Sequence, residues 1–159
     1  MENWHRLLSA LQAPLAAETL QAMADQLSPD AATLQHHARF DDTGYTRNSL
    51  LRNEHVEVLL LCWKPGQQSP IHSHGGSRCA FRVLQGEATE VRYTTQGKAA
   101  RLASVHHYGQ GQAVLARTEL AHQVLNNHPT RPLMTLHVYS PPLGDYPVYE
   151  VQQRQLVDA

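Results

Sequence analysis

Residues 65–86 read PGQQSPIHSHGGSRCAFRVLQG and are the most informative part of the chain. His72 and His74 stand one residue apart, and Cys79 follows five residues after His74. Because alternate side chains of a strand share a face, the two histidines are predicted to point the same way. A pair of imidazoles on one face is typical of a metal site, but also of two solvated histidines, so the pair alone leaves both interpretations open.

Segments rich in β-branched and aromatic residues surround this stretch, and turn signals such as TTQGK, GQG and NNHPTRP separate them. About eight or nine short strands, spaced by roughly ten residues, predict a β-sandwich or barrel. The predicted strands are 57–63, 79–86, 88–93, 100–108, 112–116, 122–126, 133–140 and 146–151.

The N-terminal part of the chain, residues 1–40, is predicted to be helical. Leu7 and Leu11 recur at helical spacing. Ser28 before Pro29 has the form of a helix N-cap followed by the first helical residue. We expect these helices to cap the β-barrel, since neither a linker nor an internal repeat divides the chain.

Composition narrows the possible functions. The 159 residues are 42% hydrophobic and carry a net charge of −1, with 13 scattered basic residues. This balance argues against binding to nucleic acid or to an anionic membrane surface. No apolar run reaches the roughly 18 residues of a membrane span, and the N-terminus does not have the form of a secretion signal. Two cysteines are too few for a disulfide framework, so we expect a cytoplasmic protein. A closed barrel of this modest size leads us to expect a monomer.

The segment quoted above resembles the first conserved motif of the cupin superfamily. Five residues separate Gly66 from His72, and four separate His74 from Cys79. Six more residues separate Cys79 from Gly86. The resemblance implies a mainly β fold, a jelly-roll-like cupin barrel with the N-terminal helices as its cap.

His122 is the best candidate for a further ligand. With Asn126 after three intervening residues, it resembles the end of the second cupin motif. The usual Pro-x-Gly of that motif is replaced by ARTELAH, which changes the local turn but not the histidine. We therefore expect a single cupin domain over residues 1–159, with a helical part at 1–40 and a β-barrel at 41–159.

His72, His74 and His122 together form a candidate site with three neutral ligands. Most cupins have a glutamate, usually a fourth ligand, where this chain has Cys79. Three imidazoles leave the full charge of a divalent ion uncompensated, which favours an anionic, soft donor such as a thiolate. Zinc could occupy the same ligands.

A more specific resemblance is to the cysteine dioxygenase family. The matching pieces run from residue 45 to residue 142 and are YTRN, LCW, IHSH, SRC, LQG, HQVLN and LHVYSPP. Members use mononuclear non-haem iron to add both atoms of dioxygen to the sulfur of L-cysteine, giving cysteine sulfinic acid. The resemblance therefore implies Fe(II) held by the three histidines, and L-cysteine and dioxygen as the reactants.

The same resemblance implies the residues that bind the substrate. Arg47 matches the arginine that holds the substrate carboxylate, and a guanidinium fork suits a bidentate carboxylate. Without the resemblance, Arg47 would be interpreted as a surface charge. Tyr45 matches a tyrosine beside it. Trp63 and Leu61 match positions in the pocket wall, although ordinary strand packing explains them nearly as well.

Tyr139 matches the tyrosine whose hydroxyl reaches the iron site, and His137 matches its hydrogen-bond partner. An aromatic side chain packed at a strand end is the simpler alternative for Tyr139. Thr135 stands where the family often has serine, and the three residues would share one strand face. Cys79 matches the cysteine that a thioether bond joins to the tyrosine in animal members. We predict that Cys79 and Tyr139 can form this crosslink; a buried free thiol is the alternative.

Rival functions remain. A related thiol dioxygenase that prefers 3-mercaptopropionate typically has glutamine in place of the arginine, so Arg47 favours cysteine. A non-enzymatic cupin sensor, a cupin isomerase or a zinc protein belongs to other classes. None of these needs Arg47, Cys79 and Tyr139 together.

Overall fold

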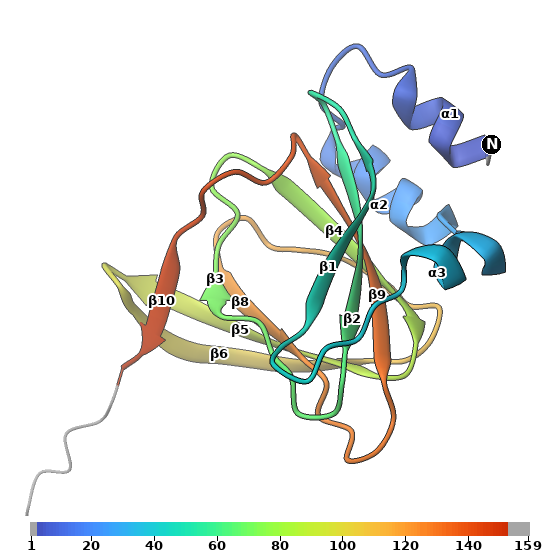
Figure 1. Ribbon diagram of the computed structural model, residues 1–159. Coiled ribbons are helices and arrows are strands. Elements are labelled where there is room, and N and C mark those ends of the chain that lie inside the picture. Colours follow the sequence, from blue (N-terminus) through green and yellow to red (C-terminus); the bar gives the residue numbers. More distant parts are fainter. Residues whose placement is uncertain (1–2, 153–159) are drawn as a thin grey trace, which may run out of the picture.

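The structure is a computed structural model that describes residues 3–152, and it consists of two β-sheets with three helices outside one of them (Figure 1). The helices are α1 (Asn3–Ser9), α2 (Ala17–Gln26) and α3 (Ala31–His37). The strands are β1 (Thr46–Arg52), β2 (Glu57–Trp63), β3 (Ile71–His72), β4 (Arg78–Gln85), β5 (Ala88–Gln96), β6 (Ala99–Tyr108), β7 (Ala113–Leu115), β8 (Ala121–Leu125), β9 (Leu133–Ser140) and β10 (Val148–Val151).

One of the two sheets is open, and the other closes on itself. The first has the order β1-β2-β9-β4-β7, and every pair within it is antiparallel. The second, β10-β3-β8-β5-β6, closes on itself because β10 pairs with β6 in parallel. The mainly β prediction is confirmed. All eight predicted strands are present, but β1 and β3 were missed by the sequence interpretation.

The apolar run of β2 is explained by burial on both of its faces. All seven residues of this strand are buried. Leu59, Leu61 and Trp63 belong to the core cluster between the sheets. Val58, on the alternate face, belongs to a second cluster that also contains Leu8 and other residues of the helical segment. A strand between two apolar layers needs no polar face, so the sequence shows no alternation there.

The helices cover the outer face of the first sheet, where α2 packs against β4, β7 and β9 (Figure 1). The predicted cap of α3 was wrong. Asp30, not Ser28, is the N-cap, and its carboxylate accepts a hydrogen bond from the Thr33 amide at 2.7 Å. Pro29 therefore precedes the cap, because the aspartate two residues after Ser28 satisfies the free amide of the first turn. Within residues 3–152, none of the helices has the length and apolarity that crossing a bilayer requires.

Gly86 joins β4 to β5 at a position that admits no side chain. Its φ is +84°, in the left-handed region. A Cβ atom there would lie 2.5 Å from the backbone oxygen of Pro132. The glycine of the quoted segment is thus needed where β4 turns into the second sheet. That turn takes the chain from β4 in the first sheet to β5 in the second, where β5 pairs with β8, the strand that carries His122.

Candidate functional site

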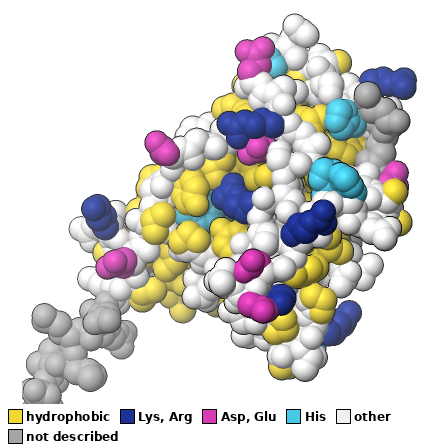
Figure 2. All heavy atoms as spheres, viewed as in Figure 1, with side chains coloured by type: hydrophobic (Ala, Val, Ile, Leu, Met, Phe, Trp, Pro, Cys, Tyr) yellow, Lys and Arg dark blue, Asp and Glu magenta, His cyan; other side chains and the backbone are white. Residues whose placement is uncertain are grey.

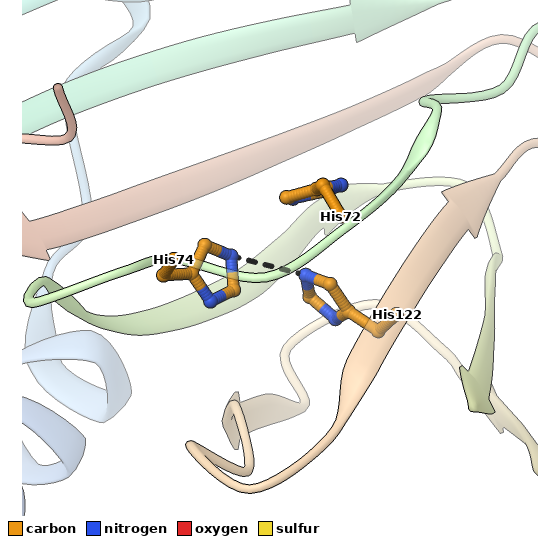
Figure 3. Close-up of side chains that lie close together, drawn as sticks. All are labelled: His72, His74 and His122. Carbon is orange, nitrogen blue, oxygen red and sulfur yellow. Dashed lines mark hydrogen bonds between the residues drawn. The ribbon is translucent and has the colours of Figure 1, made fainter. Parts of the chain in front are cut away.

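Three histidine side chains meet between the two sheets (Figure 3). His72 ends β3 and stands opposite His122 in the pairing of β3 with β8. His74 lies two residues beyond the end of β3, so the predicted shared direction holds without a regular strand. Their ring centroids are 4.8 to 5.0 Å apart, and one nitrogen from each ring lies within 4.8 Å of the other two. Each side chain is at most 9% exposed.

The inner nitrogens of His72 and His122 are available to a metal because other atoms contact the outer ones. Nδ1 of His72 lies 2.8 Å from the backbone oxygen of Pro70, and Nδ1 of His122 lies 2.8 Å from Oε2 of Glu90. Nε2 of His122 is 3.2 Å from Nε2 of His74 (Figure 3). Two nitrogens bound to one ion at about 2.1 Å lie roughly 3.0 to 3.4 Å apart. The cluster therefore fits a divalent ion, which a small movement of His72 would complete.

The surroundings keep two of the three rings, His72 and His74, neutral. Burial, followed by the proximity of His122, lowers the pKa of His72 to about 4. The same two causes and the nearby His72 lower the pKa of His74 to about 2. Both imidazoles are consequently unprotonated at neutral pH, which is the form that binds a metal.

Glu90 on β5 belongs to this site and was missed by the sequence interpretation. It is 1% exposed. Burial opposes its charge, but the hydrogen bond and charge of His122, together with Arg92, bring the net pKa of the carboxyl below its usual value. A signal was present in ATEVRY, since Glu90 and Arg92 are two residues apart in a strand and share a face. An acidic and a basic residue on that face indicate an internal ion pair.

The opposite side of the site comes from the first sheet and includes Arg47 on β1. Its guanidinium carbon lies 5.9 Å from the ring centroid of Tyr139. Tyr45 stacks on Trp63 with the ring centroids 4.3 Å apart. On the face drawn in Figure 2, basic and histidine side chains lie next to each other among hydrophobic ones. One small pocket joins the two walls, and it is lined by Tyr45, Arg47, Leu61, Trp63, Ser69, His72, Val124, His137, Tyr139 and Tyr146.

A row of hydrogen bonds runs along this wall from Trp63. The indole Nε1 donates to Oγ1 of Thr135 at 2.9 Å. The hydroxyl of Thr135 lies 2.9 Å from Nε2 of His137, whose Nδ1 lies 3.3 Å from the hydroxyl of Tyr139. Burial lowers the pKa of His137 well below its usual value, so this ring is neutral and carries one N–H. With the threonine donating to Nε2, His137 donates to the oxygen of Tyr139 and leaves the phenolic hydrogen free.

Cys79 and Tyr139 face each other directly across the β4–β9 pair. The thiol is 1% exposed and the tyrosine 2%. Burial raises the pKa of Cys79, and the nearby Glu90 raises it further. The thiol also raises the pKa of the Tyr139 hydroxyl, after the larger effect of burial. The two residues predicted to crosslink are therefore adjacent, whereas the other free cysteine, Cys62, belongs to the same first sheet but to β2.

Tyr146 is a second residue of the site that the sequence interpretation missed. It lies in the segment between β9 and β10, and its ring centroid is 5.3 Å from that of His72. It lines the pocket and interacts electrostatically with Arg47 and Tyr45. The segment SPPLGDYP has the composition of a turn, and nothing in its pattern indicates that it folds back over the histidines.

Comparisons with known proteins agree with this geometry. A family model described as cysteine dioxygenase type I matches residues 5–152. Cysteine dioxygenase type 1 of Homo sapiens is 31% identical over 134 residues, which cover 79% of this chain and 65% of the human one. The chain thus spans about 65% of the length of the curated relatives it matches.

Solved structures support the fold. A conserved protein with a double-stranded beta-helix domain from Klebsiella pneumoniae is 21% identical, with a TM-score of 0.60. The match covers 78% of this chain and 99% of that one. A cupin family protein from Methanocaldococcus jannaschii is 20% identical, with a TM-score of 0.50, and the match covers 65% of this chain and 86% of that one. The cupin fold predicted from the sequence is confirmed.

Proposed function

The chain belongs to the cysteine dioxygenase type I family, and on that premise we propose that it is a thiol dioxygenase that converts L-cysteine and dioxygen to cysteine sulfinic acid. The observation that carries the proposal is a single pocket lined by His72 of the histidine cluster and by Arg47 and Tyr139 of the opposite wall. A positive side chain within one small molecule's length of a metal site suits a substrate that carries both a carboxylate and a metal-binding sulfur.

His72, His74 and His122 are the proposed ligands of Fe(II). When bound, the ion supplies the redox chemistry and the open coordination positions at which thiol and dioxygen meet. The neutral state of His72 and His74, the 3.2 Å between two of the donor nitrogens and the contacts at Nδ1 of His72 and His122 support this assignment.

Arg47 and Tyr45 are the proposed anchors of the substrate carboxylate. Arg47 can meet both carboxylate oxygens with its planar fork, and its position opposite the histidines sets which end of the substrate reaches the metal. The stacking of Tyr45 on Trp63 holds the tyrosine ring in one orientation. Trp63 thus acts on the substrate through Tyr45 and through the wall of the pocket.

Tyr139 is the proposed hydrogen-bond donor to the reacting groups. His137 orients it by donating to its oxygen, which leaves the phenolic hydrogen for the pocket or for Cys79. We propose that Cys79 and Tyr139 also form the thioether bond. In that step the thiol S–H and one ring C–H break and an S–C bond forms. Dioxygen accepts the two electrons and two protons that are released.

A cytoplasmic location and a monomeric state complete the proposal. Two free, buried thiols suit a reducing compartment. The proposed reactants are small molecules, L-cysteine and dioxygen, with neither nucleic acid nor membrane as a partner.

The proposal is tested by oxygen uptake of the Fe(II)-loaded protein with L-cysteine, 3-mercaptopropionate and cysteamine, each with mass spectrometry of the product. We expect uptake with L-cysteine, one dioxygen consumed for each sulfinate formed. Cysteamine lacks the carboxylate and is the matched control for Arg47. Faster turnover of 3-mercaptopropionate would reject the proposed substrate. Bound iron without uptake on any of the three thiols would reject the enzymatic function and favour a sensor.

A further inference from the structure

We propose that Glu90 is a positioning residue of the metal centre, which fixes His122 in the tautomer that presents Nε2 to the ion and supplies a negative charge next to three neutral ligands. The inference rests on the proposed metal site, and it concerns a residue that neither chelates the ion nor touches the substrate pocket.

Both oxygens of the buried Glu90 carboxylate have hydrogen-bond partners. Oε2 of Glu90 lies 2.8 Å from Nδ1 of His122. Oε1 accepts from Nε of Arg92 at 2.9 Å and from the hydroxyl of Tyr108 at 3.1 Å. Nη2 of Arg92 also donates to that hydroxyl at 3.2 Å, which closes a three-residue network. The network holds the carboxylate from the side away from the histidine.

The chemistry of this contact fixes the proton of His122. An ionised carboxylate only accepts hydrogen bonds, so Nδ1 of His122, which faces it, carries a proton. In the neutral form of the ring, which is the form that binds a metal, this is its one ring-nitrogen proton. Nε2 then presents its lone pair at the point where it lies 3.2 Å from Nε2 of His74. In the other tautomer, an N–H would point into the position of the ion and would have to be lost before binding.

The charge of Glu90 has a second effect. A divalent ion bound by three imidazoles keeps its full charge in a site whose ligands are almost fully buried. A carboxylate one ring away offsets part of that charge. The glutamate that many cupins place among the ligands is replaced by Cys79 in this chain, and Glu90 provides a carboxylate behind a ligand instead.

Glu57 is a matched control in the same barrel. It is also a buried carboxylate, 6% exposed, and pairs with an arginine, Arg52, at 3.0 Å. Its carboxylate accepts hydrogen bonds from Arg52 and Ser49, neither of which is a proposed ligand of the metal. Replacing either glutamate with glutamine removes a buried charge, but only Glu90→Gln changes the partner of a proposed ligand.

The experiment is an anaerobic Fe(II) titration of metal-free wild-type protein, Glu90→Gln and Glu57→Gln, repeated with Co(II) so that its visible spectrum reports the geometry of the site. We expect Glu90→Gln to lower the affinity of the protein for both Fe(II) and Co(II) by about 10- to 100-fold and to alter the Co(II) spectrum. We expect the affinity of Glu57→Gln for both ions to lie within about twofold of that of wild type, even if the substitution lowers the stability of the fold. Equal affinities of wild type and Glu90→Gln would overturn the proposal.

A second measurement needs no variant and therefore does not depend on the folding of Glu90→Gln. Nitrogen-15 NMR of the histidine rings in metal-free wild type should show His122 protonated at Nδ1. Protonation at Nε2 would overturn the proposal. The proposed function can fail without affecting this test. If wild type binds Fe(II) but consumes no dioxygen with any thiol, the enzymatic proposal is rejected, and the metal affinities of wild type and Glu90→Gln can still be compared.

Discussion

The two walls of the site are built from different sheets and stabilise their functional side chains differently. In the wall from the second sheet, which we call the charged wall, charged side chains lie behind the metal ligand. His122 contacts the carboxylate of Glu90, and Glu90 in turn contacts the guanidinium of Arg92. The wall from the first sheet, which we call the neutral wall, presents the guanidinium of Arg47 to the pocket, but its other functional groups are neutral. Tyr139 is backed by His137 and, through Thr135, by the indole of Trp63. The difference follows from what each wall would hold, a cation on one side and an anionic substrate with its oxidant on the other.

The comparison separates binding of the metal from binding of the substrate. If it is correct, changes in the charged wall affect metal affinity first, and changes in the neutral wall affect turnover while the metal remains bound. Four perturbations test this separation.

Loss of a ligand should give the largest effect. His74→Ala removes one of the three ligand nitrogens, so we expect Fe(II) affinity to fall by more than about 100-fold. This loss exceeds the effect of removing a residue, such as Glu90, that only contacts a ligand. Oxygen uptake with L-cysteine should fall to background. Metal content after gel filtration measures the first effect, and His36→Ala, which changes an exposed histidine of α3, is the control. Full metal occupancy in His74→Ala would contradict the proposed ligand set.

Loss of the guanidinium should leave the metal in place. Arg47→Gln removes a charge-assisted, bidentate contact with the carboxylate, and kcat/KM for L-cysteine should fall by about 10- to 100-fold. The rate with cysteamine, which has no carboxylate, should change little. Steady-state kinetics on both thiols and an Fe(II) titration check this. An equal loss of metal would show that the two walls are not separable.

Acid should destabilise the metal-free protein through the charged wall. The pKa values of His72 and His74 fall on folding from about 6.5, the unfolded value, to about 4 and about 2. The unfolded chain therefore binds more protons below pH 6.5, and the free energy of unfolding decreases as the pH falls from there. We expect a loss of roughly 1 kcal/mol per pH unit for each histidine, down to its folded pKa.

Urea unfolding of metal-free protein at pH 7.0, 6.0 and 5.0 measures this loss. His74→Ala, which lacks one of the histidines whose pKa is lowered on folding, should show the shallower dependence on pH. Identical slopes for the two proteins would mean that His74 is not held in its neutral form by the fold.

The smallest effect should come from the neutral wall. Thr135→Val keeps the shape of the side chain but removes the hydroxyl between Trp63 and His137. We expect kcat to fall by about 3- to 10-fold, since one buried hydrogen bond is worth about 1 kcal/mol, with metal affinity unchanged. Stopped-flow turnover on iron-loaded protein tests this. A weakened metal site in Thr135→Val would contradict the independence of the walls.

The sequence by itself determined those features that depend on local patterns of residues. The eight strands with β-branched or aromatic runs, the helical N-terminus and the pair His72 and His74 could all be read from spacing, because periodicity follows from the geometry of one element. The family motifs added His122, Arg47 and Tyr139 as candidates, although no rule of spacing joins positions so distant in the chain.

Only the tertiary structure decided which of these side chains meet. β1 was missed because its sequence, TRNSLLR, is mostly polar, and the pairing with β2 rather than its own propensity makes it a strand. Glu90 and Tyr146 were missed because their importance depends on what lies opposite them. Hydrogen bonds between strands far apart in the chain arise from pairing and closure of the sheets, and a single sequence contains no periodicity for such contacts.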